Sequence, residues 1–159
     1  MSRPVIAVPT RAAAILLVAA LTACRPHPKS ASASAGNITV TGAFALAPLT
    51  PDVGAAYFTI RNTDTVPDTL RAVVTEIASM AVLHSQLREG GGMRMQQLVQ
   101  LEIPPGGEVV LSPGGTHLML MEFKHVPRAG EKFPLTLDFA HAGKVSLELP
   151  VRAYSDAQE

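Results

Sequence analysis

Tryptophan is absent from this chain of 159 residues, aromatic residues make up only 4% of it, and it has a single cysteine, Cys24. One cysteine cannot close a disulfide within the chain, and everything after Cys24 is unable to hold a metal ion through thiolates. The scarcity of aromatic residues means that a core must be built mainly from aliphatic side chains, phenylalanine and methionine. Metal binding after Cys24 would have to use histidine, methionine and carboxylate groups.

An excess of basic residues is also missing, since 13 Lys and Arg residues balance 13 Asp and Glu residues. Arg3 and Arg11 are the basic residues that precede Cys24, in a stretch without acidic residues, so 11 basic and 13 acidic residues follow it. Proteins that bind nucleic acids usually carry a basic stripe or patch. We therefore expect no nucleic-acid partner.

Residues 1–23 have the pattern of a signal peptide. Arg3 and Arg11 precede the apolar run 12–21, which is shorter than the roughly 20 apolar residues that a membrane-spanning helix needs. The run ends in Leu21-Thr22-Ala23-Cys24, which resembles the lipobox of bacterial lipoproteins, where cleavage precedes a cysteine that then receives a lipid. We expect lipidation of Cys24; secretory cleavage after Ala23 without a lipid is the alternative.

Three further segments follow the expected cleavage site. Residues 24–36 are rich in Ser, Ala and Pro, a composition that buries little apolar surface, so we expect the lipidated cysteine to be followed by a flexible tether. Residues 37–154 have the sequence pattern of one folded β-domain. Residues 155–159 form a C-terminal tail that contains neither histidine nor methionine, so we expect no second metal site there.

Short runs of alternating apolar and polar residues, separated by Pro, Gly, Asn and Asp, predict β-strands throughout the domain. The runs span residues 38–46, 54–61, 68–77, 81–87, 94–101, 107–111, 117–123, 133–139 and 144–152. Helical periodicity is not sustained anywhere. This pattern predicts an all-β domain, either an antiparallel sandwich or a Greek-key barrel.

Five methionines besides Met1 fall within the 42 residues from 80 to 121. They are Met80, Met93, Met95, Met119 and Met121. Methionine often fills irregular gaps in cores, and we expect this role for Met80. The clustering of the others calls for a second explanation.

Strand geometry places some of these sulfurs beside imidazole rings. Residues i and i+2 of a strand project from the same face, with Cα atoms about 7 Å apart, so His117 and Met119 share a face, as do Met93 and Met95. His84 could approach from a neighbouring strand. Neutral thioether and imidazole groups favour Cu(I) over zinc, magnesium or calcium. A site built from them also persists in an oxidising compartment, where free thiols would be lost to disulfides.

The spacing of these residues carries a family resemblance. His84 is followed after ten residues by Met95, after twenty-one more by His117 and after one more by Met119, which matches the His/Met pattern of the periplasmic PCuAC-type copper chaperones. The stretches GGMRMQQL, EIPPGGEVVLSPGGTHLMLMEFK, GEKFPLTLDF and LPVRAY are similar to that family too, and the resemblance covers nearly all of residues 37–154.

The resemblance implies a cupredoxin-like Greek-key β-barrel or sandwich that binds Cu(I). The implied copper ligands are His84, Met95, His117 and Met119. Met93 and Met121 lie two residues from the implied methionine ligands, so we expect them to line the pocket or to substitute as ligands.

Membership of that family would also imply delivery of copper to the respiratory cytochrome oxidase, directly to an oxidase subunit or through a thiol-bearing copper chaperone. With Cys24 as lipid anchor, the expected location is periplasmic, on a bacterial envelope membrane. Two other functions stay open. One is an envelope copper-buffering or resistance protein with the same site, and the other is a metal-free β-sandwich binding module whose methionines belong to the core.

Enzymatic activity is not expected. Ser85 follows His84 directly, and adjacent strand residues point to opposite faces, which argues against a nucleophile and base pair. Blue-copper electron transfer requires a cysteine thiolate, and the domain has no cysteine. His125 and His141 have no partner at a ligand-like spacing, so we expect both to face solvent.

Overall fold

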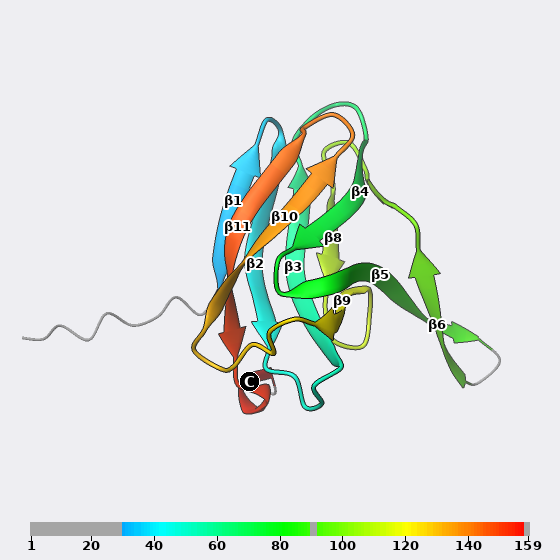
Figure 1. The fold of residues 1–159 in the computed structure, drawn as a ribbon. Helices are drawn as coiled ribbons and strands as arrows, with labels where there is room; N and C mark the ends of the chain where they lie inside the picture. Colours follow the sequence, from blue (N-terminus) through cyan, green and yellow to red (C-terminus); the bar gives the residue numbers. More distant parts are fainter. Residues whose placement is uncertain (1–29, 90–91, 158–159) are drawn as a thin grey trace, which may run out of the picture.

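The computed structural model describes residues 30–89 and 92–157, and nearly all of the ordered elements in these residues are β-strands (Figure 1). The strands are β1 (Ala31–Ala35), β2 (Ile38–Leu46), β3 (Val53–Asn62), β4 (Asp68–Thr75), β5 (Ala78–Glu89), β6 (Gly92–Leu98), β7 (Leu101–Ile103), β8 (Glu108–Leu111), β9 (His117–Phe123), β10 (Lys132–Phe139) and β11 (Lys144–Arg152). A short 3-10 helix, Tyr154–Ala157, follows β11. The expected all-β class is confirmed.

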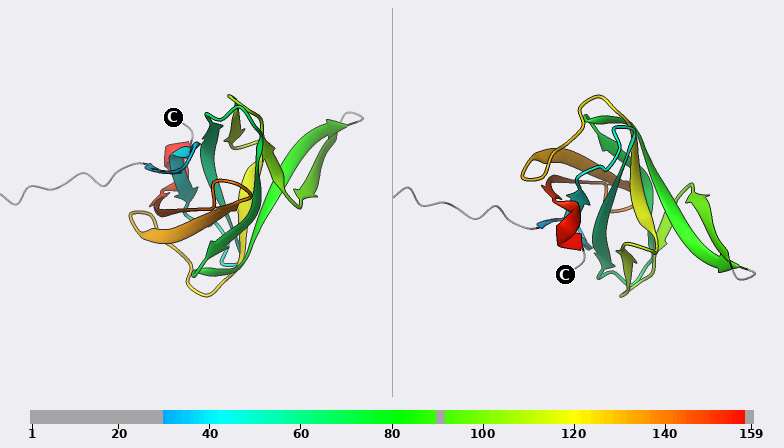
Figure 2. Two further views of the ribbon diagram at one scale, coloured as in Figure 1. Left: turned by 90° about the horizontal axis from the view of Figure 1, so that it is seen from above. Right: turned by 90° about the horizontal axis from the view of Figure 1, so that it is seen from below.

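The strands form a wrapped sheet with the hydrogen-bonded order β6-β5-β9-β3-β2-β11-β10-β4-β7, to which β1 adds beside β2 and β8 beside β3. Figure 2 shows the two layers that this wrapping creates. The path does not close into a complete barrel within the described residues. All strand pairs are antiparallel except one, since β11 runs parallel to β2.

The core lies between the layers and is mainly aliphatic, with Phe58, Phe133 and Phe139 also buried in it. β9 illustrates the alternation: Leu118 and Leu120 are buried, while Met119 and Met121 on the other face are partly exposed. The largest fully buried side chains are those of Phe139, Ile38, Ile60, Leu70, Ile103, Leu118, Leu120, Leu135, Leu137, Leu149, Val40 and Val145.

The expected tether is wrong for its last part, because residues 31–35 form strand β1 and pair with β2. Ala33 and Ala35 pack against the core, so this stretch buries more apolar surface than its composition suggests. Gly36 has a φ of 53° between Ala35 and its partner Ile38, and glycine at the first position of a two-residue hairpin loop supplies the positive φ that a type II′ turn needs. The signal peptide, Cys24 and residues 25–29 lie outside the described residues.

The run predicted at 94–101 is two strands, β6 and β7, so that single-strand prediction is wrong. Val99 and Gln100 separate them, and Val99 is 88% exposed. β6 pairs only with β5 in the described chain, and β7 pairs with β4 in the other layer. The β5–β6 ribbon, which we call the arm, projects from the body of the domain (Figures 1 and 2).

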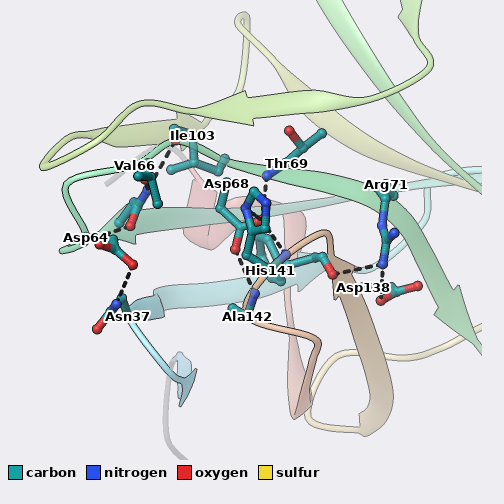
Figure 3. Close-up of polar contacts among 12 residues, drawn as sticks. Asn37, Asp64, Val66, Asp68, Thr69, Arg71, Ile103, Asp138, His141 and Ala142 are labelled. Atoms are coloured by element: carbon teal, nitrogen blue, oxygen red, sulfur yellow. Dashed lines mark hydrogen bonds and ion pairs between the residues drawn. The ribbon is translucent and has the colours of Figure 1, made fainter.

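Asp68 ties the β10–β11 turn to the start of β4, at the end of the domain drawn uppermost in Figure 1. Its buried carboxylate accepts hydrogen bonds from the backbone N–H groups of Thr69 (2.7 Å), His141 (2.9 Å) and Ala142 (2.9 Å), as Figure 3 shows. These bonds satisfy turn N–H groups that strand pairing leaves without a partner. In residues 30–89 and 92–157, no helix is long and apolar enough to cross a membrane.

Candidate metal centre

His84 and His117 lie directly opposite each other on the neighbouring antiparallel strands β5 and β9. Directly opposed residues of an antiparallel pair project from the same face. Their rings are stacked, with centroids 6.2 Å apart and planes 25° from parallel. Two histidines separated by 32 residues in the sequence therefore have their rings together on the sheet face opposite the core, where His84 is partly buried and His117 is buried, at 8% exposed.

The turn before β9 fixes the position of His117. Pro113 and Gly114 occupy the central positions of a turn closed by a 3.1 Å hydrogen bond from Gly115 N–H to the Ser112 carbonyl, and Gly114 has a φ of 77°. Proline followed by a glycine with positive φ is the composition of a type II turn. The turn leads β8 into β9 along the same edge of β3, so β9 begins at His117.

The same turn orients the His117 ring. Its Nδ1 lies 2.9 Å from the Gly115 carbonyl oxygen, which can only accept, so Nδ1 carries the proton and donates it. The lone pair is then on Nε2, the nitrogen free to bind a metal. Metal-binding histidines commonly have their other ring nitrogen held in this way. Pro113-Gly114 in the sequence is a signal for the turn. The contact between His117 Nδ1 and the Gly115 carbonyl is seen only in the folded structure.

The His84 ring contains the one buried side-chain nitrogen or oxygen in the described chain that has no hydrogen-bond partner, Nδ1. A buried polar atom without a partner costs about 1 to 3 kcal/mol. His84 therefore has an unused nitrogen beside the His117 ring, where an ion would find two imidazoles.

Met119 follows His117 by two residues and shares its face. It pairs with Val82 of β5 on one side and with Ala55 of β3 on the other, and its side chain is partly exposed. Sequence spacing therefore placed Met119 correctly next to the histidine pair.

Met95 lies on the arm, opposite Gln86 of β5, and is 50% exposed. Because Gln86 is two residues from His84, Met95 projects from the same face as the two histidines. In a flat sheet, two strand spacings and two residues would leave the Cα atoms of Met95 and His117 roughly 12 Å apart. Two-stranded ribbons twist more than wide sheets do, so the bend of the arm controls how closely the Met95 sulfur approaches.

The remaining methionines are on this outer face too. Met93 lies further along the arm and is exposed, and Met121 follows Met119 on β9. The expectation that Met80 belongs to the core is wrong, because its side chain is 43% exposed. Met80 stands two residues before Val82 and four before His84, and therefore projects away from the core.

The two other histidines in the described chain, His125 and His141, are exposed, as expected. His125 lies 3.2 Å from Glu131 and His141 3.5 Å from Asp68. Within the described ranges, no group of three or more His, Cys, Asp or Glu side chains could hold a metal ion. Ser85 lies 3.4 Å from Thr116 through their hydroxyl oxygens, on the face opposite His84.

Comparison with known proteins places this geometry in a family. The family described as "Putative lipoprotein LpqE-like" matches residues 38–151. The chain belongs to this LpqE-like family. It is also 33% identical over 155 residues to "Putative lipoprotein Lxx21020" of Leifsonia xyli subsp. xyli, which covers 94% of this chain and 92% of that protein.

Solved structures of PCuAC domains have the same fold. CuI-DR1885 from Deinococcus radiodurans is 30% identical, with a TM-score of 0.62 over 75% of this chain and 80% of that chain. The apo PCuAC domain of PmoF1 is 27% identical, with a TM-score of 0.65 over 77% and 98%. The copper-bound PCuAC domain of PmoF2 is 24% identical, with a TM-score of 0.67 over 77% and 97%. The expected likeness to PCuAC domains, and with it the cupredoxin-like fold class, is confirmed.

Proposed function

We propose that this LpqE-like protein is a Cu(I)-binding chaperone of the bacterial cell envelope. The observation that carries the proposal is the stacked pair His84 and His117, with Met119 next to it on an outer sheet face. Two neutral imidazoles and thioethers suit a soft monovalent ion. Met95 on the arm would complete a set of two nitrogen and two sulfur ligands.

Transfer by ligand exchange fits the exposure of the two thioethers, while His117 is buried. Met95 is half exposed and Met119 partly so, so a partner could reach the ion without unfolding the domain. Thioethers are weak, uncharged donors, and thiolates of a copper-accepting protein would displace them one at a time. The oxidation state of the copper ion does not change in such an exchange. The transfer is driven by the stronger donors of the partner protein.

The location that we propose is the periplasmic side of an envelope membrane, with Cys24 carrying the lipid. The lipoprotein description of the family and of the Leifsonia relative supports this location. The recipient that we propose is a copper centre of cytochrome oxidase, reached directly or through a thiol-bearing copper chaperone. The His/Met spacing and the copper-bound PCuAC neighbours support copper handling.

We do not propose an enzymatic role, because the hydroxyl of Ser85 contacts Thr116 and not His84. The rival function, a metal-free binding module with methionines in its core, fits poorly with the exposure of Met80, Met93 and Met95. Core methionines would be covered.

Anaerobic addition of Cu(I) to the folded protein tests the site. With nitrogen-labelled histidine followed by NMR, one equivalent should shift the ring signals of His84 and His117 together. The signals of His125 and His141 should stay in place and act as internal controls. If one equivalent shifts only the exposed histidines, the proposed centre is wrong.

Delivery and buffering differ in cells. If the protein delivers copper, cells without the gene should lose oxidase activity when copper is scarce and regain it when copper is added. If it buffers copper, the same cells should keep normal oxidase activity and become sensitive to excess copper, which would contradict the delivery role.

A further inference from the structure

The face that carries the two histidines continues along the β5–β9 pair as a series of opposed residues. His84 faces His117, Val82 faces Met119, and Met80 faces Met121. All six positions lie on the face opposite buried Leu83, Leu118 and Leu120. Met80 is the most exposed of the six, and His117 is itself buried. The last pair consists of two thioethers that the proposed copper ligands leave unused.

Packing does not account for Met80. Its side chain is 43% exposed, and Met121, opposite it, is partly exposed. Methionine in a core fills irregular gaps, but an exposed strand position has no gap to fill. A pair of outward-facing thioethers beside a soft-metal site has a chemical use instead.

We propose that Met80 and Met121 form a second soft-metal site, with Met119 shared between it and the histidine pair. This proposal rests on the proposed function, because it supplies a path along which Cu(I) leaves the main centre. Opposed residues of an antiparallel pair have Cβ atoms about 4.5 to 5.5 Å apart, and diagonal neighbours are about 7 to 8 Å apart. Thioether side chains at these separations can converge on one ion.

The step that links the two sites is an exchange of ligands. The ion keeps its bond to the Met119 sulfur and loses the bonds to the Met95 sulfur and to the ring nitrogens of His84 and His117. It gains bonds to the sulfurs of Met80 and Met121. All donors are neutral, so the ion stays monovalent and no proton or electron moves. The second site lacks imidazole and is therefore the weaker of the two.

Titration with Ag(I), a soft monovalent ion that does not change oxidation state under these conditions, tests the proposal on protein labelled at the methionine methyl groups. The first equivalent should shift the His84 and His117 rings and the Met119 methyl signal. A second, weaker equivalent should shift the methyl signals of Met80 and Met121. Anaerobic Cu(I) should follow the same order.

Substitution separates this proposal from the proposed function. In Met80→Leu the second equivalent should be lost while the first keeps its histidine shifts. Val110→Leu, a change at an exposed strand position of β8 that carries no sulfur, should keep both equivalents. The second site alone would be overturned if the wild-type protein bound one equivalent at the histidines and no second. It would also be overturned if Met80→Leu kept the second equivalent. Failure of the first equivalent at the histidines would overturn the proposed function as well.

Discussion

At the scale of single residues, a substitution at Met119 can separate the effect of the sulfur on Cu(I) affinity from the effect of side-chain volume on stability. Leucine and methionine have similar volumes, and exchanges between them usually cost less than about 1.5 kcal/mol. Met119→Leu should therefore lower Cu(I) affinity by at least about tenfold, equivalent to about 1.4 kcal/mol, with little change in unfolding free energy. Competition with a Cu(I) chelator and urea unfolding of the same samples measure the two effects.

A matched control lies on the arm. Met93→Leu makes the same chemical change at an exposed strand position, and we expect a smaller loss of affinity. Equal Cu(I) affinity for Met119→Leu and the unsubstituted protein would contradict the assignment of Met119 as a ligand.

The position of a site residue could be predicted from the sequence where the alternation of side chains along one strand was enough to fix its face. The i and i+2 rule placed His117 and Met119 on one face, and the spacing to His84 indicated a neighbouring strand. The same rule applied from His84 back to Met80 would have placed Met80 outside the core. The contact between His117 Nδ1 and the Gly115 carbonyl depends on a turn geometry that a residue pattern only suggests.

At the scale of elements, the arm should respond to the metal. Met95 is exposed on β6, which pairs only with β5 in the described chain, and elements with few buried contacts open most readily. Cu(I) bound between the histidines and Met95 should slow amide hydrogen exchange in residues 92–98. Met95→Leu should abolish this slowing and keep the response of the His117 ring. Exchange in the arm that is the same with and without Cu(I) would argue against Met95 as a ligand.

Strand β1 offers a second prediction at this scale. A protein that begins at Asn37 should be less stable than one that begins at Ser30, because Ala31, Ala33 and Ala35 pack against the core. The expected loss is on the order of 1 to 2 kcal/mol, since three methyl groups at about 0.8 kcal/mol each are only partly buried. Urea unfolding of the two proteins gives the difference. Equal midpoints and slopes would mean that residues 30–36 act only as a tether.

The sequence located most elements because strands alternate and turn residues interrupt them. β2, β9 and β11 begin and end where the pattern predicted. The pattern could not separate β6 from β7, since the break at Val99 carries no glycine or proline. It missed β1 because an Ala and Ser segment becomes a strand only when a neighbouring strand supplies its hydrogen bonds.

At the scale of the whole molecule, the buried Asp68 carboxylate should make stability depend on acid. Burial acts to raise its pKa, but the N–H groups of Ala142, His141 and Thr69 stabilise the charged form, and the pKa is lowered from its ordinary value of 3.8. A lowered pKa in the folded state means that ionised Asp68 stabilises the fold above pH 3.8. This contribution should be lost as the pH falls below that value.

Asp68→Asn tests this contribution. An amide can accept through one oxygen only, so at least one backbone N–H group loses its acceptor, at a cost of about 1 to 3 kcal/mol at pH 7. Urea unfolding at pH 7 and pH 3 should show a large difference at pH 7 and a smaller one at pH 3. Asp138→Asn is the control, because the 3.5 Å ion pair of Asp138 with Arg71 is partly exposed and should contribute at most about 1 kcal/mol. Unchanged stability of Asp68→Asn at pH 7 would contradict the proposed role.

X-ray absorption at the copper edge of the protein loaded with one equivalent of Cu(I) tests the central claim most directly. The four proposed ligands predict an inner shell of two nitrogen and two sulfur donors around the ion. Replacing Met95 and Met119 together by leucine should remove the sulfur donors and leave the nitrogens of His84 and His117. An inner shell of nitrogen and oxygen alone in the unsubstituted protein, or a sulfur count that survives the double substitution, would contradict the account.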